Sequence, residues 1–321
     1  MNPLSQPQPE KSWYSKEKAG SRVIVCMPAF NEEKYIASTV LKVRKHYRNV
    51  FVIDDASVDE TALMARKAGA QVIGHTENQG YGGALRTCFK IGKEQGADCL
   101  VILDSDGQHD PDQIQLLVEP IIGGKVDLVI GSRFKSREAR KNIPSYRMLG
   151  IQTITQVFNL GTSMELTDSQ SGFRAYSKKA LGSIKVTSDM MDASMEILFD
   201  AKEHMFRIKE VPIVVKYEGV EGSSEGPWSH GMKVLGQTVR LIRERDPMRF
   251  FGVIGGSMIF LIPFVILYTK QYHPVESGFM ALGGMYIVTV LSILGSFFIF
   301  TGVMLKGVKR ISDRILDMMN D

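Results

Sequence analysis

The chain has 321 residues, of which 44% are apolar, 23% charged and 9% aromatic. This ordinary globular mixture excludes intrinsically disordered, collagen-like and disulfide-scaffold proteins. The 39 basic and 35 acidic residues leave a net charge of +4, which is too small to indicate a nucleic-acid partner on its own.

Residues 1–20 are polar and lack the apolar run of a signal peptide, which is typical of a disordered leader. The three cysteines, Cys26, Cys88 and Cys99, are few and widely spaced. We expect them to be reduced, buried thiols, with a reactive cysteine as the alternative. Both observations indicate a domain that faces the cytosol.

Residues 21–228 alternate short β-rich runs with helical stretches. Strands are expected at 22–27, 50–54, 71–75, 98–104 and 126–131, and helices at about 32–46, 59–68, 82–95 and 111–122. This alternation with continuous apolar strands predicts an α/β fold, Rossmann-like, with a mainly parallel sheet and helices on both faces. Ligands of such folds bind at the carboxyl ends of strands, so the residues that follow each strand are candidates for chemistry.

Polar residues follow the first two expected strands. In PAFNEE (28–33) the proline is expected to end the strand, and Asn31 suits the cap of the next helix. In DDASVDET (54–61) two adjacent carboxylates need hydrogen-bond donors, which a nucleobase N–H or a ribose hydroxyl can supply. Asp59 in the same segment is expected to cap the following helix.

A glycine-rich turn and an acidic turn follow the third and fourth strands. ENQGYGGA (77–84) leads into a helix and could hold an anion on its backbone N–H groups, although it is neither a Walker motif nor a dinucleotide fingerprint. DSDGQHDP (104–111) presents alternate carboxylates to a divalent cation and leaves room for waters and a diphosphate. A solvated acidic turn is the alternative, but its place after a buried strand favours the cation.

Three arginines are candidate phosphate ligands, because the planar guanidinium donates two hydrogen bonds at once. Arg133 lies in GSRF (131–134) after the fifth strand, and Arg174 ends the polar segment 168–174. Arg147 lies near the start of a helix. Ordinary salt bridging is the alternative for each.

Two uncharged apolar segments, residues 250–269 and 278–305, are long enough as helices to cross a hydrocarbon core of roughly 30 Å. Buried core helices are the alternative, although these normally carry a polar face. Five Lys or Arg lie in 233–249 and four in 306–314, whereas the connector 270–277 holds one. The positive-inside rule therefore predicts a hairpin in the cell membrane, with the N-terminal domain and both termini in the cytoplasm. The expected order is a cytoplasmic domain (21–228), an amphipathic juxtamembrane helix (229–249), two transmembrane helices (250–305) and a cytoplasmic tail (306–321).

In order and spacing, the motifs PAFNEE, DDASVDET, ENQGYGGA, DSDGQHDP, GSRF and DSQSGFRAY resemble family 2 glycosyltransferases of the GT-A fold, and within them the dolichyl-phosphate hexose synthases. The similarity covers roughly residues 21–249, and the hairpin entered by DPMRFFGVIGG is similar to the membrane region of archaeal-type members. The resemblance implies transfer of one sugar from a nucleotide-sugar to dolichyl or polyprenyl phosphate at the cytoplasmic face of the membrane. It implies Mg²⁺ or Mn²⁺ as the cofactor, and it leaves a homo-oligomer open.

Position by position, the resemblance assigns residues to four roles. The implied metal ligands are Asp104, Asp106 and Gln108. The implied nucleotide-sugar site is Pro28, Ala29, Asn31, Glu32, Asp54, Asp55, Asn78, Gly80, Asp104, Ser105 and Asp106. The acceptor phosphate is assigned to Arg133 and Arg147, which with Asp106 are the expected catalytic residues, and the sugar side to Arg174, Asp192 and Glu196.

One segment departs from the mannose synthases of the family, which usually carry an Arg and a later Gly-x-Ser-Lys after the strand that here reads VPIVVKY (211–217). Residues 218–231 are instead rich in glycine and contain Trp228. The departure favours UDP-glucose or UDP-N-acetylhexosamine, with GDP-mannose as the alternative. We expect a loop that orders over donor and acceptor, and a plain linker to the membrane is the other interpretation.

A lipid monophosphate is mostly a dianion at neutral pH, because its second pKa is about 6. Such an acceptor needs no general base, and a single displacement would invert the anomeric centre. A processive polysaccharide synthase is one rival, but the chain's two tryptophans, Trp13 and Trp228, do not follow an arginine as in the Gln-x-x-Arg-Trp motif of those enzymes. A non-catalytic lipid-flipping or scaffold partner is a second rival, against which the retained metal ligands speak.

Overall fold

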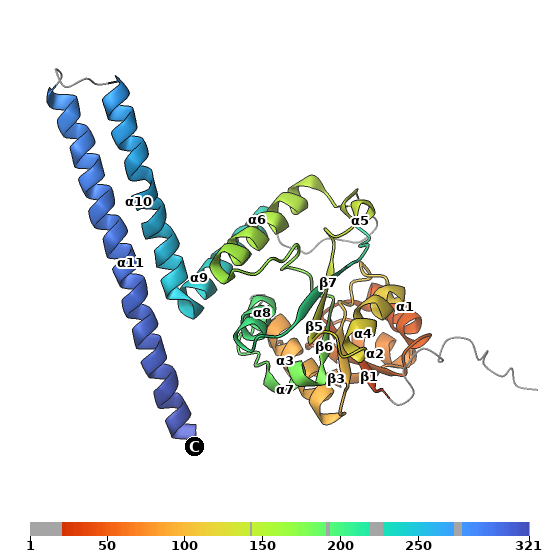
Figure 1. The fold of residues 1–321 in the computed structure, drawn as a ribbon. Helices are drawn as coiled ribbons and strands as arrows, with labels where there is room; N and C mark the ends of the chain where they lie inside the picture. Colours follow the sequence, from red (N-terminus) through yellow and green to blue (C-terminus); the bar gives the residue numbers. More distant parts are fainter. Residues whose placement is uncertain (1–20, 142, 191–192, 218–226, 273–277, 321) are drawn as a thin grey trace, which may run out of the picture. The chain divides into compact units, whose positions relative to one another are not determined.

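The computed structural model describes residues 21–320 except 142, 191–192, 218–226 and 273–277 (Figure 1). The expected leader, Asp192 and most of the glycine-rich segment 218–231 therefore lie outside the described residues. The chain divides into two units. The sheet unit comprises Met1–Thr155 and Glu165–Val234, and the helical unit comprises Gln156–Met164 and Leu235–Asp321.

Seven strands of the sheet unit form one sheet in the order β3-β2-β1-β4-β6-β5-β7. They are β1 (Val23–Ala29), β2 (Asn49–Asp54), β3 (Gln71–Gly74), β4 (Cys99–Ile102), β5 (Leu128–Ser132), β6 (Arg174–Ser177) and β7 (Ile208–Pro212). Neighbouring strands are parallel except for the two pairs made by β6, which runs antiparallel between β4 and β5. The expected mainly parallel sheet is confirmed. The sequence did not reveal β6, because four residues are too few for a strand pattern to be recognised.

Helices cover both faces of the sheet (Figure 1). On one face α1 (Glu33–Arg44), α2 (Thr61–Lys67) and α4 (Ile114–Ile122), which follows the short 3-10 helix η2 (Pro111–Gln113), share a buried core with alternate strand residues such as Val25 and Met27. The other face carries α3 (Gly80–Glu94), α7 (Lys178–Ser183) and α8 (Ala193–Glu203). All three cysteines are buried and outside disulfides, as expected, and burial raises the pKa of the Cys88 and Cys99 thiols.

Pro28 does not end the first strand, contrary to expectation. β1 continues to Ala29, and Pro28 stands opposite Ile53 of β2. On its other side β1 pairs with β4 only as far as Cys26. Residues two positions apart in a strand direct their backbone groups to the same side, so position 28, like Cys26, faces β4. Because β1 and β4 are no longer paired at position 28, the N–H that proline lacks costs the sheet no hydrogen bond.

The helical unit holds α9 (Pro227–Arg245), α10 (Pro247–Tyr272) and α11 (Gly278–Asn320), apart from the start of α9, together with the end of α6 (Ser145–Thr162). Glycines let α10 and α11 approach closely: a Cβ added at Gly255 would lie 2.4 Å from the carbonyl oxygen of Gly295. Small residues at a helix–helix contact are typical of packing in membranes. α11 continues as a helix through most of the expected tail, to Asn320.

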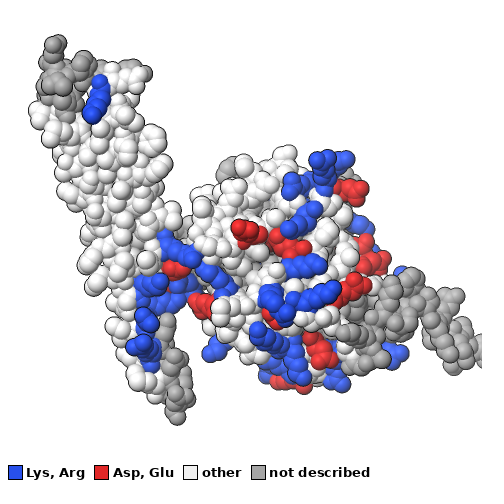
Figure 2. Space-filling view, in the orientation of Figure 1, with Lys and Arg blue, Asp and Glu red and all other residues white. Residues whose placement is uncertain are grey.

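Two helical segments, Pro247–Gln271 and Leu282–Ser312, are long and apolar enough to cross a membrane, with mean hydropathies of 2.4 and 2.2. Only 6% and 11% of their most apolar windows are buried, whereas a core helix of a soluble protein is mostly buried. On the face shown in Figure 2 the middle of the hairpin carries no Lys, Arg, Asp or Glu, and basic side chains gather where α9 ends and α10 begins. These features favour the expected membrane hairpin over buried core helices.

Candidate active site

A cavity of about 700 Å³ opens at the carboxyl ends of β1, β2 and β4. Its lining includes most of the residues expected to bind the nucleotide-sugar: Pro28, Ala29, Glu32, Asp55, Asn78, Gly80, Asp104, Ser105 and Asp106. Ser105 donates a hydrogen bond from its hydroxyl to the Pro28 carbonyl (2.7 Å), which joins the ends of two neighbouring strands. Parallel strands therefore bring motifs that are far apart in the sequence to one site, as the fold class predicts.

Asn31 and Asp54 do not line this cavity, and they serve the loops around it. The Asn31 side-chain oxygen accepts from the Val58 N–H (3.0 Å), and the Asn31 N–H donates to the Ser57 hydroxyl (2.9 Å). Asn31 thus ties the β1–α1 loop to the β2–α2 loop, and the expected helix cap is wrong. The Asp54 carboxylate accepts a long hydrogen bond from the Ser57 N–H (3.4 Å), and its carbonyl accepts from the His75 N–H (2.8 Å).

Asp55 and Asp59 are held by protein donors. The Asp55 carboxylate contacts Nδ1 of His75 (2.6 Å) and accepts from the Gln79 N–H (2.9 Å). Asp59 accepts from the Thr61 N–H at the start of α2 (2.9 Å) and also from the Glu33 N–H of α1 (3.2 Å), but the N-cap position of α2 is Glu60 and not, as was expected, Asp59. No motif pointed to His75, because its partner Asp55 lies 20 residues away in the sequence.

The glycine-rich turn at the start of α3 does not offer the expected anion site. The Gln79 N–H donates to Asp55, the Gly80 N–H to the Asn78 side chain (3.0 Å) and the Gly82 N–H to the Asp189 carbonyl (3.0 Å). The glycines instead allow close packing. A Cβ added at Gly82 would lie 2.0 Å from the Ser188 carbonyl oxygen.

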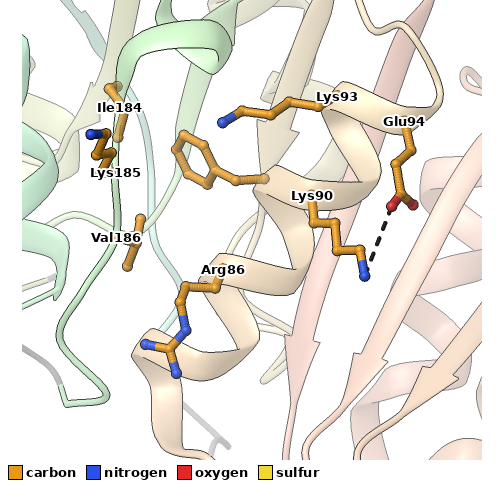
Figure 3. Close-up of a pocket in the computed structure, with 8 residues that line it drawn as sticks. Arg86, Lys90, Lys93, Glu94, Ile184, Lys185 and Val186 are labelled. Carbon is orange, nitrogen blue, oxygen red and sulfur yellow. Dashed lines mark ion pairs between the residues drawn. The ribbon is translucent and has the colours of Figure 1, made fainter. Parts of the chain in front are cut away.

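The segment 187–189 that packs on this turn is held from two sides. The buried Glu196 carboxylate accepts from the N–H groups of Thr187 (2.8 Å) and Ser188 (3.0 Å), so Glu196 acts on the cavity through this segment. Arg86 of α3 donates to the Ser188 carbonyl (3.1 Å) and pairs with Asp189. Arg86 also lines a second cavity of about 520 Å³, with lysines of α3 on one side and residues 184–186 on the other (Figure 3).

Four carboxylates, those of Glu32, Asp55, Asp104 and Asp106, line the main cavity. Burial and the neighbouring Asp106 raise the pKa of Glu32 to about 7, and Asp59 and Asp104 add to this. Burial and Asp104 likewise raise the pKa of Asp106. Negative charge is thus crowded in a partly desolvated place, where a cation would relieve the repulsion.

The donor set fits a divalent cation that keeps open positions for substrate oxygens. Asp104 and Asp106 offer carboxylate oxygens, and no group of three His, Cys, Asp or Glu among the described residues is placed to hold a metal alone. Mg²⁺ is commonly bound by one or two carboxylates plus substrate phosphates. Gln108, the third expected ligand, lies outside the cavity lining; its N–H donates to Asp106 (2.9 Å).

Arg133 and Arg147, the expected acceptor ligands, differ in their surroundings. Arg133 forms a bidentate pair with the fully buried Asp168, with Nε and Nη2 each 2.7 Å from a carboxylate oxygen. Salt bridging, the alternative for Arg133, is therefore confirmed. Arg147, in the first turn of α6, lies over the Tyr217 ring (5.5 Å to the centroid). No carboxylate in the described part of the chain pairs with Arg147, and its charge helps to lower the pKa of Asp106 against the larger effects of burial and Asp104.

Arg174 is not placed to bind phosphate, because its buried guanidinium is used within the protein. It donates to the carbonyls of Ser169 (2.9 Å), Ser171 (2.8 Å) and Ser194 (2.7 Å). The interpretation as a phosphate ligand is therefore wrong. Arg174 instead supports one wall of the cavity, because the segments whose carbonyls it binds also carry residues that line the cavity. Tyr81 belongs to the same wall.

A family profile for Glycosyl transferase family 2 matches residues 24–184. An uncharacterized protein of Methanocaldococcus jannaschii is 37% identical over 218 residues, covering 66% of this chain and 89% of that protein. The UDP-N-acetylglucosamine–dolichyl-phosphate N-acetylglucosaminyltransferase of Methanococcus voltae is 35% identical over 222 residues, 62% of this chain and 87% of that protein. The dolichol-phosphate mannosyltransferase of Pyrococcus furiosus is 27% identical over 291 residues, 86% of this chain and 79% of that protein.

Solved structures show the same fold. Glucosyl-3-phosphoglycerate synthase from Mycobacterium tuberculosis, in complex with Mn²⁺, UDP and phosphoglyceric acid, superposes with a TM-score of 0.55 at 22% identity. The match covers 71% of this chain and 79% of that one. The sheet order, the cavity at the strand ends and the family match agree with one another, and the chain belongs to family 2 of the glycosyltransferases.

Proposed function

We propose that the protein transfers a single sugar, with inversion, from a UDP-sugar to dolichyl or another polyprenyl phosphate at the cytoplasmic face of the cell membrane. The preferred sugars are glucose and N-acetylhexosamine. The observation that carries the proposal is that Asp106 lines the cavity of about 700 Å³ and also lies near enough to Arg147 for the positive charge of Arg147 to lower the pKa of Asp106. One site thus offers carboxylates for a metal and a cation for a second phosphate.

The donor half of the site is built for a nucleoside diphosphate with a divalent cation. Asp104 and Asp106 would hold Mg²⁺ or Mn²⁺, which supplies positive charge for the departing diphosphate. Asp55 and Asn78 line the cavity beyond these carboxylates and are the candidates for the nucleoside. Glu32 adds to the negative field that attracts the cation.

The acceptor half rests on Arg147 in preference to Arg133. Among the described residues no carboxylate pairs with the Arg147 guanidinium, which lies over the Tyr217 ring, whereas the Arg133 guanidinium is held by Asp168. Arg147 would hold the lipid phosphate close to the anomeric carbon, mainly an orientation effect. A bond forms between a phosphate oxygen and that carbon as the bond to the diphosphate breaks. An α-linked donor therefore gives a β-linked lipid product, and no protein base is required.

The names of relatives support this acceptor. The Methanococcus voltae relative is named for dolichyl phosphate, and a Micrococcus luteus relative, 32% identical over 202 residues, for undecaprenyl phosphate. GDP-mannose is the second candidate donor, because the Pyrococcus furiosus mannosyltransferase matches 86% of this chain. The two apolar helices would keep the enzyme beside its lipid acceptor.

The direct test incubates membranes containing the protein with polyprenyl phosphate and radiolabelled UDP-glucose, UDP-N-acetylglucosamine or GDP-mannose, followed by lipid extraction. We expect label in the lipid fraction with a UDP-sugar, loss of transfer in EDTA and recovery with Mn²⁺ or Mg²⁺. Label from GDP-mannose alone would correct the donor. Full transfer in chelator would overturn the metal assignment.

Arg147→Ala tests the acceptor site without leaving a buried charge unpaired. We expect transfer at low polyprenyl phosphate to fall about 10- to 150-fold, because a charge-assisted contact to phosphate is worth about 1.5–3 kcal/mol. Affinity for the nucleotide-sugar should change little, and Arg147→Lys should recover part of the loss. Kinetics at varied lipid concentration give the measurement. A loss confined to nucleotide-sugar affinity would place Arg147 on the donor side.

A further inference from the structure

One wall of the main cavity is formed by polar side chains to which the reaction above gives no role. Tyr81, Gln170 and Ser194 line the cavity together with Asp104. They come from three separate segments: the first turn of α3, the loop before β6 and the first turn of α8. A hydroxyl of Tyr, an amide of Gln and a hydroxyl of Ser are groups that donate to and accept from sugar hydroxyls.

Gly172 shows how closely these groups approach the carboxylate. A Cβ added there would lie 2.7 Å from an Asp104 carboxylate oxygen and 3.0 Å from the Tyr81 hydroxyl. The hydroxyl and the carboxylate therefore converge on one point, which only glycine leaves open. The Tyr81 hydroxyl also forms a hydrogen bond with the Ser194 side chain, so these two hydroxyl groups lie together in the wall.

The wall is held in place from behind. Arg174 is 1% exposed and joins the two segments that carry Gln170 and Ser194, through the carbonyls of Ser169, Ser171 and Ser194. A site whose groups are fixed before the ligand arrives loses less entropy on binding.

We infer that the Tyr81 hydroxyl donates a hydrogen bond to a hydroxyl of the transferred sugar, and that Gln170 and Ser194 complete a polar sugar subsite. The inference rests on the proposed function, because it takes the cavity to hold a nucleotide-sugar. With the diphosphate at Asp104 and Asp106 and the nucleoside toward Asp55, the sugar is the part of the donor left to meet this wall. Tyr81 is therefore a sugar-contacting residue.

Tyr81→Phe removes the hydroxyl and keeps the ring that packs beneath it. Calorimetric titration of the full chain with UDP-N-acetylglucosamine and with UDP, both in Mn²⁺, separates the sugar from the rest of the donor. We expect a two- to tenfold weaker affinity for the UDP-sugar, the range for one neutral hydrogen bond, and unchanged affinity for UDP. Ser194→Ala should act in the same direction. Tyr47→Phe removes the hydroxyl of a buried tyrosine that does not line the cavity, and it should change neither affinity.

Equal losses for UDP and the UDP-sugar would overturn the inference, because Tyr81 would then support Asp104 or the diphosphate. Unchanged affinities in Tyr81→Phe would overturn it as well. These titrations contain no lipid. If the wild-type protein shows the expected pattern but transfers no sugar to polyprenyl phosphate, the acceptor in the proposed function is wrong and the sugar subsite stands.

Discussion

Glu32 shows how burial and neighbouring charge set the protonation state of a single residue in the cavity. Its pKa is about 7 in the folded chain, against an ordinary value of 4.5. Between these values the folded state keeps a proton that the unfolded state has lost. Stability therefore falls as pH rises through this window and levels off above it.

Glu32→Gln removes this titration. In metal-free buffer we expect the wild-type protein to lose more stability than the variant between pH 5 and pH 8, by on the order of 1 kcal/mol because the side chain is only half-buried. Melting temperatures of the full chain at both pH values give the measurement. Mn²⁺ should reduce the difference, because a cation favours the carboxylate. Equal pH dependence of the two proteins would show that Glu32 titrates normally.

Residue identity predicted the cavity better than it predicted the arginines. The alternation of strands and helices places the residues that follow each strand at one edge of the sheet. Nine of the eleven residues expected to bind the nucleotide-sugar, all but Asn31 and Asp54, therefore line one cavity. The pairing of Arg133 with Asp168 spans 35 residues and connects two different motifs. A single sequence shows both groups but not their distance, so a phosphate ligand and a salt bridge look alike.

At the scale of elements, the start of α3 depends on the segment 187–189. Gly82 meets the Ser188 carbonyl so closely that any side chain must displace it. The same turn carries Gly80 and Tyr81, which line the cavity. A packing contact between a helix and a loop thus sets the shape of the donor site.

Gly82→Ala should therefore lower stability by about 1–3 kcal/mol, the usual cost of overpacking, and weaken nucleotide-sugar binding. Melting temperature and titration with UDP-N-acetylglucosamine measure the two effects. Gly74→Ala is the matched control, because a Cβ there meets nothing within 4 Å. If Gly82→Ala behaves like the control, the loop is free to yield and does not shape the site.

Elements with strong periodicity were predictable, and elements defined by partners were not. The helices α1 to α4 and the apolar strands β1 to β5 lie within a few residues of their expected positions, whereas α11 extends 15 residues past its expected end at 305 (320 − 305). β6 was missed, because its place is set by β4 and β5 and not by a pattern of its own. The end of β1 was misplaced because the cost of Pro28 depends on whether a neighbouring strand still needs its N–H.

At the scale of the whole molecule, the charge on either side of the apolar helices predicts their orientation. Membrane-impermeant maleimide should label Lys270→Cys in intact cells, and Arg310→Cys only after permeabilisation. The native cysteines are buried, so they give little background. Labelling of both positions from outside would contradict a hairpin that returns to the cytoplasm.

The position of β6 in the sheet determines when the sheet can be completed as the chain is synthesised. β4 and β5 are neighbours along the chain, but the sheet is not continuous between them until residues 174–177 have been inserted. A nascent chain that ends before this point holds β4 and β5 with open edges, which invite pairing with other chains. The sheet can close once β7 has emerged, before α10 begins at Pro247. The order of synthesis thus allows the sheet unit to complete its fold before the two apolar helices α10 and α11 are made.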